Sequence, residues 1–155
     1  MAQVSNGMDR PSRLSRIDRF PDYWAGDDGQ IYSWKTRHLR ALVATPDRDG
    51  YLGVNLYDRT GRRTYVRVHA LVCRAFHGPA APGQTCVRHL NGVQTDNHAD
   101  NLCWGTNRQN QEDRLRNLEA ERMIHAGLVP ADWTDEIARL GKRTETRDLA
   151  NRVPF

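Results

Sequence analysis

Alternation of apolar and polar positions is clearest at residues 51–57, which read YLGVNLY. Val54 and Leu56 fall on one face of an extended chain, because successive side chains of a strand point to opposite faces. The turn sequence DRTG follows at 58–61, and the alternation resumes over 64–68. This pattern predicts a β-hairpin with one buried face.

The rest of the first half also has the pattern of short strands. Residues 30–34 (QIYSW) and 39–43 (LRALV) are strand-like, and with the hairpin they predict a strand-rich unit over 18–68. Residues 1–17 are polar and lack periodicity, which predicts a flexible basic arm.

A change of period marks the second half. In HALVCRAF, residues 69–76, apolar side chains recur at the spacing of one helix face. TCVRHL (85–90) and NLCWG (101–105) are predicted to be short strands on either side of the polar loop NGVQTDNHAD.

Helix signals follow the second of these strands. Thr106 followed by Gln109 fits a capping box and predicts a helix start, and Gly127 is a good stop. Residues 132–143 and 145–151 are predicted to form two further helices.

Together these elements predict an α+β fold in four segments. A basic arm (1–17) precedes the strand-rich unit (18–68), a strand-loop-strand-helix core follows (69–126), and a helical tail comes last (127–155). A chain of 155 residues has room for one ordinary domain or two very small ones.

The basic charge is concentrated in the first half. Residues 1–75 carry 13 Lys and Arg against 8 Asp and Glu, a net of +5, while residues 76–155 carry 10 against 11, a net of −1. Nearly all the cations are arginine, since only Lys35 and Lys142 are lysine. Arginine offers a planar fork that fits phosphate groups and guanine edges. The first half therefore favours a polyanionic partner, although a coding bias toward arginine explains the same composition.

The three cysteines, Cys73, Cys86 and Cys103, are an odd number in a chain without a secretion signal, which argues against a disulfide scaffold. No apolar run approaches the ~20 residues that span a bilayer. We therefore expect a soluble cytoplasmic protein with no membrane partner.

Three polar residues lie where the predicted strands and helix begin or end. His89 ends the first strand, Asn101 opens the second strand twelve residues later, and Asn110 lies one turn into the helix, nine residues further on. Two antiparallel strands with a helix packed across them would bring these side chains together. A neutral histidine can take a proton from water, and one amide can ligate a hard cation such as Mg²⁺. The other amide can orient the histidine or tie the loop.

At these positions the chain resembles a known family. RHLNGVQTDNHADNLCWGTNRQN, residues 88–110, is similar to the HNH nuclease motif, also called the ββα-metal or His-Me finger, and most of all to that of phage and intron-encoded homing endonucleases. The motif's histidine, middle asparagine and final histidine or asparagine fall at His89, Asn101 and Asn110. Upstream, residues 23–33 and 49–57 resemble the modular DNA-binding motif that often precedes such nucleases.

The resemblance implies a metal-dependent endonuclease that hydrolyses double-stranded DNA to 5′-phosphate and 3′-hydroxyl ends. It implies that His89 activates water, that Asn101 positions His89, and that Asn110 holds Mg²⁺ or Mn²⁺. It is compatible with a nickase or homing endonuclease of a phage or mobile element, acting in the host cytoplasm if phage-encoded. One active site cuts one strand at a time, so a double-strand cut needs a homodimer or two sequential events.

One position departs from the family pattern. Many homing relatives carry a metal-binding Asp or His immediately before the catalytic histidine, and this chain has Arg88. We expect Arg88 to contact a DNA phosphate and Asn110 to be the lone direct metal ligand. Further arginines expected to contact DNA are Arg63, Arg67, Arg108 and Arg114.

Two rival interpretations stay open. Arg88 favours a DNA-binding module that keeps the scaffold but cuts weakly or not at all. The second rival is a small zinc-supported interaction domain, since His69 and Cys73 lie four apart on one helix face. Zinc is the less favoured ligand, because the chain has no paired C-x-x-C units, and the cysteines fit better as small buried residues.

Overall fold

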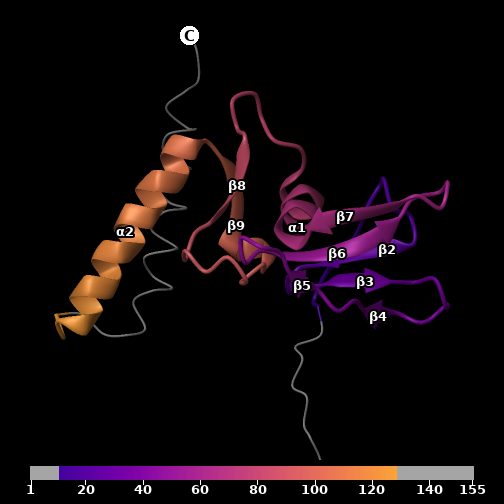
Figure 1. The fold of residues 1–155 in the computed structure, drawn as a ribbon, viewed down its shortest axis with the longest axis horizontal. Coiled ribbons are helices and arrows are strands. Elements are labelled where there is room, and N and C mark those ends of the chain that lie inside the picture. The colour runs from indigo at the N-terminus through magenta and orange to yellow at the C-terminus, as the bar shows by residue number, and fades with distance from the viewer. Residues whose placement is uncertain (1–10, 129–155) are drawn as a thin grey trace, which may run out of the picture.

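The computed structural model describes residues 11–128 and has the predicted α+β fold (Figure 1). This part of the chain contains three small antiparallel sheets, two α-helices and one 3-10 turn. Residues 1–10 of the predicted arm, and the helices predicted at 132–143 and 145–151, lie outside the described residues.

The first sheet has four strands in the order β1-β2-β3-β4. They are β1 (Leu14–Arg16), β2 (Tyr23–Gly26), β3 (Ile31–Ser33) and β4 (Arg40–Ala41). The third and fourth confirm the strands predicted within 30–34 and 39–43, although the fourth is shorter than its apolar run.

Strand β1 corrects the prediction of a flexible arm over residues 1–17. Leu14 pairs with Gly26 in the antiparallel β1–β2 register, and Ile17 is buried in the hydrophobic core. A three-residue strand has too few positions to show a period, so its partner strand determines its conformation.

The second sheet contains the predicted hairpin. Its strands are β5 (Thr45–Pro46), β6 (Leu52–Tyr57) and β7 (Arg63–Arg67), in that order. Val54 lies opposite Val66 across the β6–β7 ladder. Val54 and Leu56 are buried and Asn55 between them is exposed, as the alternation predicts.

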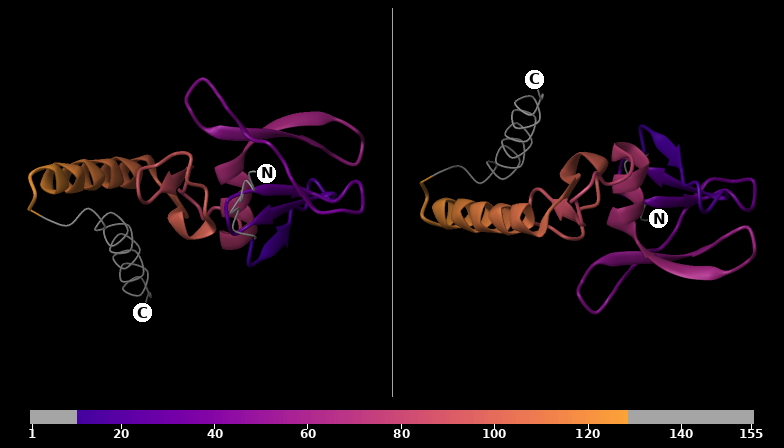
Figure 2. Two further views of the ribbon diagram at one scale, coloured as in Figure 1. Left: turned by 90° about the horizontal axis from the view of Figure 1, so that it is seen from below. Right: turned by 90° about the horizontal axis from the view of Figure 1, so that it is seen from above.

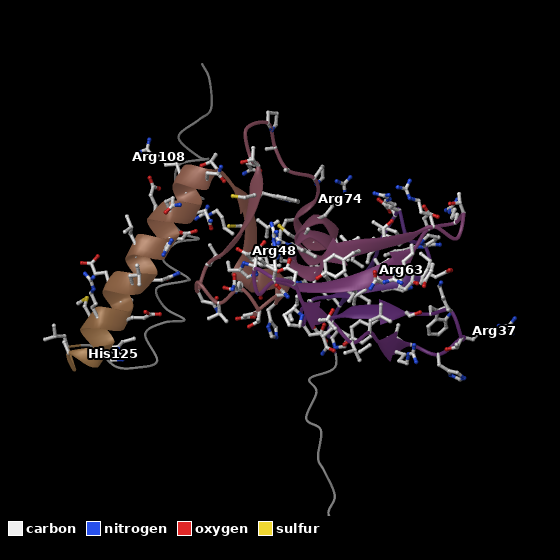
Figure 3. All side chains as sticks on the ribbon, in the orientation of Figure 1. Arg37, Arg48, Arg63, Arg74, Arg108 and His125 are labelled. Carbon is white, nitrogen blue, oxygen red and sulfur yellow. The ribbon has the colours of Figure 1, made fainter. Side chains whose placement is uncertain are left out.

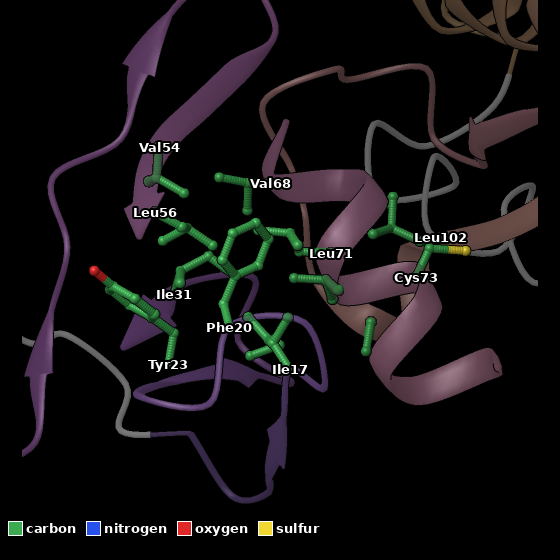
Figure 4. Packing of buried hydrophobic residues seen from close by; sticks show 13 residues of the cluster. Ile17, Phe20, Tyr23, Ile31, Val54, Leu56, Val68, Leu71, Cys73 and Leu102 are labelled. Carbon is green, nitrogen blue, oxygen red and sulfur yellow. The ribbon is translucent and has the colours of Figure 1, made fainter. Parts of the chain in front are cut away.

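Helix α1 (Val68–His77) follows β7 directly and confirms the predicted helix. Its buried side joins both sheets in one core, where Leu71 packs in a cluster with Phe20, Ile31 and Leu56 (Figure 4). Burying each such side chain contributes about 1.5–3 kcal/mol, so this cluster fixes α1 against the strands.

The third unit is a strand-loop-strand-helix arrangement. It consists of β8 (Cys86–His89), the 3-10 turn η1 (Ala99–Asn101), β9 (Leu102–Gly105) and α2 (Asn107–His125). His89 lies opposite Leu102 in the antiparallel register. Leu102 is fully buried and belongs to the common core. The end of the β8–β9 pair that carries His89 is therefore packed against the first two sheets and α1.

The start of α2 has the predicted capping box. The Thr106 hydroxyl accepts a hydrogen bond from the Gln109 backbone N–H at 3.2 Å, and the Gln109 side chain accepts one from the Thr106 N–H at 2.8 Å. From there α2 runs away from the two larger sheets (Figure 2). Only Asp113 and Ala120 of this helix are buried. Neither helix within residues 11–128 combines the length and apolar character needed to cross a bilayer.

Candidate active site

His89 stands at the end of β8, and its side chain is buried, with a residue exposure of 7%. Its Nε2 atom lies 3.0 Å from the side-chain oxygen of Asn97. An amide oxygen can only accept, so Nε2 carries the ring proton and Nδ1 keeps its lone pair. No hydrogen bond of Nδ1 is found among the described residues. Nδ1 is therefore the ring atom that can accept a proton.

The surroundings of His89 keep its imidazole neutral. Burial is the largest influence and lowers the pKa of His89 from its ordinary value of 6.5, while the Asn97 hydrogen bond and the charge of Asp96 oppose it. Burial prevails, because removing the imidazolium from water costs more than these two groups restore. A histidine that is neutral near pH 7 is suited to act as a general base.

Asn97 is a site residue that the sequence analysis missed. It is buried in the loop between β8 and β9, although most of its neighbours in that loop are exposed. Most residues of the loop are polar, so residue type alone does not distinguish Asn97. The distinguishing feature is its burial against His89, which only the fold reveals.

Asn101 holds the same loop rather than the His89 ring. Its side-chain nitrogen donates to the Asn91 side chain at 2.9 Å and to the Asp96 carbonyl at 2.8 Å, while its oxygen accepts from the Asn91 N–H at 3.0 Å. The predicted direct role in orienting His89 is thus corrected to the loop tie. The loop that Asn101 ties also carries Asn97, the hydrogen-bond partner of His89.

Asn110 and His89 line one cleft of about 470 Å³. Asn110 lies in the first turns of α2 and is exposed. No hydrogen bond of its side chain is found within residues 11–128. The amide oxygen of Asn110 is therefore available to a ligand in this cleft.

Arg88 does not occupy the position predicted for it. Its side chain is 4% exposed and forms a two-pronged ion pair with Asp113 of α2, at 2.6 and 2.9 Å. Arg116 also donates to the Asp113 carboxylate. A buried, paired guanidinium cannot reach a phosphate in solvent, so the predicted DNA contact of Arg88 is corrected to a structural link between β8 and α2.

The other four predicted arginines differ in their surroundings. Arg114 is exposed and lines the cleft. Arg63 and Arg108 are exposed and lie on separate parts of the molecule, the hairpin and the start of α2 (Figure 3). Arg63 donates to Asn55 at 3.0 Å, and Arg108 pairs with Glu112 at 2.9 Å. These three have the exposure that a phosphate contact needs.

Arg67 is the most constrained of the four. Its guanidinium pairs with Asp47 at 2.6 Å and with Asp49 at 2.8 Å, and its side chain is 37% exposed. Two carboxylates offset its positive charge, so its contribution to phosphate attraction is smaller than that of Arg114.

A second histidine, His69 of α1, lies beside His89 with ring centroids 5.3 Å apart. Burial, with a smaller contribution from His89, lowers the pKa of His69 to about 4. The neighbouring Cys73 is fully buried and burial raises the pKa of its thiol to about 12. Within residues 11–128 no three His, Cys, Asp or Glu side chains form a metal-binding group.

The fold and the site define a class of protein. Two antiparallel strands are followed by a helix, a neutral histidine ends the first strand, and an exposed amide on the helix lines the same cleft. This is the ββα arrangement. Residues 66–112 match the family model described as HNH endonuclease.

Two relatives extend the comparison. An uncharacterized HNH endonuclease of Acanthamoeba polyphaga mimivirus is 28% identical over 102 residues, which cover 65% of this chain and 25% of the relative. The chain thus spans about a quarter of that relative's length. The HNH homing endonuclease I-HmuI, solved in a study of its DNA binding and cleavage, has a similar fold with a TM-score of 0.53 and 23% identity. That match covers 82% of this chain and 66% of I-HmuI.

Proposed function

We propose that the protein is a DNA endonuclease of the HNH type. The observation that carries this proposal is His89, a neutral histidine whose Nδ1 is unpaired among the described residues and which lines a cleft with Asn110. The family match over residues 66–112 supports it. The basic first half, with net charge +5 over residues 1–75, suits a polyanionic substrate such as double-stranded DNA.

In the proposed reaction, His89 Nδ1 takes a proton from a water molecule, and the oxygen of that water attacks a phosphodiester phosphorus. The bond from phosphorus to the 3′-oxygen breaks and the departing oxygen takes a proton from solvent, which leaves a 5′-phosphate and a 3′-hydroxyl. Asn97 holds the ring by its Nε2–H and stabilises the imidazolium that forms. Arg114, on the rim of the cleft, attracts the DNA backbone.

The donors in the cleft fit a loosely held Mg²⁺ or Mn²⁺. Asn110 offers an amide oxygen, whereas both oxygens of Asp113 already accept from arginines. Mg²⁺ keeps several waters and needs only one or two protein oxygens, so Asn110 would hold it together with the DNA phosphate. When bound, the ion supplies positive charge that stabilises the developing negative charge on the phosphate and on the leaving oxygen.

Plasmid cleavage tests the proposal. The wild type should nick supercoiled DNA in the presence of Mg²⁺, and nicking should stop when EDTA is added. End-mapping of the products should find 5′-phosphates. His89→Ala should lose at least ~10²-fold in rate, the lower end for general-base catalysis. The matched control is His125→Ala, since His125 is exposed at the far end of α2. Equal rates for wild type and His89→Ala would disprove the assignment of the base.

A second candidate function is DNA binding without efficient cleavage. Its support is the cleft itself, where the carboxylate of Asp113 is engaged by Arg88 and Arg116 and is not available to a cation. Gel-shift and nicking assays on the same duplex separate the two candidates. Tight binding with no nicking in Mg²⁺ or Mn²⁺ would favour the binding module.

A further inference from the structure

Tyr51, at the start of the β6–β7 hairpin, lies against both histidines of the site. Its ring centroid is 5.0 Å from that of His69, with the planes at 74°, and 6.1 Å from that of His89, with the planes at 35°. The His69 and His89 rings stand edge to face at 5.3 Å. The three side chains come from the residue before β6, from α1 and from β8, and they pack against one another at the cleft that Tyr51 and His89 line.

The hydrogen bond of His89 does not by itself fix its ring. A single bond from Nε2 to Asn97 holds one atom and leaves the ring plane free to turn about that axis. Contacts on the faces and edges of the ring must restrict that rotation. His69 and Tyr51 supply such contacts, and aromatic pairs at these separations have preferred mutual geometries.

Tyr51 is itself held in place on its other side. The Arg67 guanidinium lies 4.5 Å from the Tyr51 ring centroid, and Arg67 is anchored by ion pairs to Asp47 and Asp49. The backbone of Tyr51 closes the same turn, because its N–H donates to the Asp47 carboxylate at 3.1 Å and its carbonyl accepts from the Asp47 N–H at 2.9 Å. The ring therefore presents a fixed surface to His89.

The strand-rich unit also touches the loop that carries Asn97. The Ala99 N–H donates to the Asp27 carbonyl at 3.0 Å, and the Gln94 side chain donates to the Asp49 carbonyl at 3.2 Å. Gly29 has a φ of +81°, and a Cβ there would lie 2.5 Å from the Asn97 carbonyl carbon. The turn at Gly29 therefore packs closely against the backbone of Asn97, the hydrogen-bond partner of His89.

From these contacts we propose that Tyr51 is a positioning residue for His89, so that the strand-rich unit completes the cleavage centre as well as facing DNA. This inference rests on the proposed function of His89. It assigns to the aromatic ring of Tyr51, not to its hydroxyl, the task of holding the imidazole plane for proton transfer.

Single-turnover cleavage at saturating DNA tests the proposal in the full chain. Tyr51→Leu removes the ring and should lower the rate roughly tenfold to a hundredfold, the cost of a small misplacement of a catalytic group. Its DNA dissociation constant should stay within about twofold, because no phosphate-binding charge is lost. Tyr51→Phe keeps the ring and should cleave at close to the wild-type rate.

Tyr57→Leu is the matched control, since Tyr57 ends the strand that begins directly after Tyr51, is 40% exposed and contacts Lys35. It should cleave like the wild type. An unchanged rate in Tyr51→Leu would overturn the proposal, and so would an equal loss in Tyr51→Phe. A loss of DNA affinity without a loss of rate would make Tyr51 a DNA contact instead.

A measurement without catalysis separates this inference from the proposed function. Nitrogen-15 NMR of the histidine side chains should show His89 protonated at Nε2 in the wild type and in Tyr51→Phe. In Tyr51→Leu it should show a mixture of tautomers or a broadened signal. An unchanged His89 spectrum in Tyr51→Leu would disprove the positioning role, whether or not the protein cuts DNA. His89→Ala, in the same cleavage series, tests the base assignment alone.

Discussion

At the scale of single residues, the site contains two side-chain amides, those of Asn97 and Asn110, with different hydrogen-bonding states. Asn97 sets which ring nitrogen of His89 carries the proton. Asn110 has no hydrogen-bond partner for its side chain within the described residues and faces the cleft. One amide is therefore committed to the protein, and the other is available to a ligand.

Replacing Asn110 should abolish cleavage that depends on a divalent cation. Asn110→Ala removes an amide oxygen that no described residue engages and that lines the same cleft as His89, and a modest excess of Mg²⁺ should not restore activity. The control is Asn107→Ala, an exposed asparagine on the same helix. Metal-dependent nicking measures both variants, and an active Asn110→Ala protein would contradict the role.

The lowered pKa of His89 predicts the acid side of the pH profile. Cleavage needs the neutral imidazole, and burial moves the pKa of His89 below 6.5. Activity should therefore persist as the pH falls through 6.5 and decline only at lower pH. The pH dependence of kcat/KM reports the free enzyme and is the quantity to measure. A midpoint above 6.5 would contradict the assignment.

At the scale of elements, the link between β8 and α2 is electrostatic. Elsewhere the strands and α1 share an apolar core, but α2 buries only Asp113 and Ala120 among its own residues. The pair of Arg88 with Asp113 joins this helix to the strand that ends in His89. It therefore sets the position of Asn110 relative to His89.

Breaking that pair should be costly, because the buried Asp113 carboxylate loses both hydrogen bonds from Arg88 and keeps only the contact from Arg116. Arg88→Met should lower the free energy of unfolding by about 3–5 kcal/mol, the usual effect of removing one member of a buried pair. The double variant Arg88→Met with Asp113→Leu should recover most of this loss. Arg108→Ala, which removes an exposed pair with Glu112, should cost no more than about 1 kcal/mol. Urea unfolding compares all three, and a small effect of Arg88→Met would disprove the structural role.

At the scale of the whole molecule, the sheets and α1 pack against one another and do not form separate modules along the chain. The first two sheets and α1 share one core, and Leu102 of β9 joins it. The proposed DNA contacts are spread over the hairpin, the cleft and α2, at Arg63, Arg114 and Arg108. A duplex that touches these points would neutralise several phosphates at once.

Binding spread over such contacts should be strongly salt-dependent. Each neutralised phosphate adds about 0.9 to the slope of log affinity against log salt concentration, so a few contacts predict at least a tenfold loss of affinity between about 50 and 200 mM salt. Fluorescence anisotropy with a labelled duplex measures the slope. Arg114→Ala should reduce the slope by about one contact, and a flat salt dependence would contradict a phosphate-based interface.

The sequence by itself determined the elements whose signals are local. The β6–β7 hairpin, α1 and the capped start of α2 follow from apolar spacing and capping chemistry within a few residues. His89 at a strand end and Asn110 in the first turns of the helix are placed by those local signals, and the fold brings both to one cleft.

Only the tertiary structure decided which polar groups meet. Strand β1, the Asn97 partner of His89, the Asp113 partner of Arg88 and the Tyr51 ring all depend on residues 8 to 38 positions away. Such pairings leave no period in the sequence, because a buried polar side chain is selected by the one group it must satisfy. From the sequence, Arg88 beside His89 is therefore predicted to bind a phosphate, because only the fold shows that Asp113 is its partner.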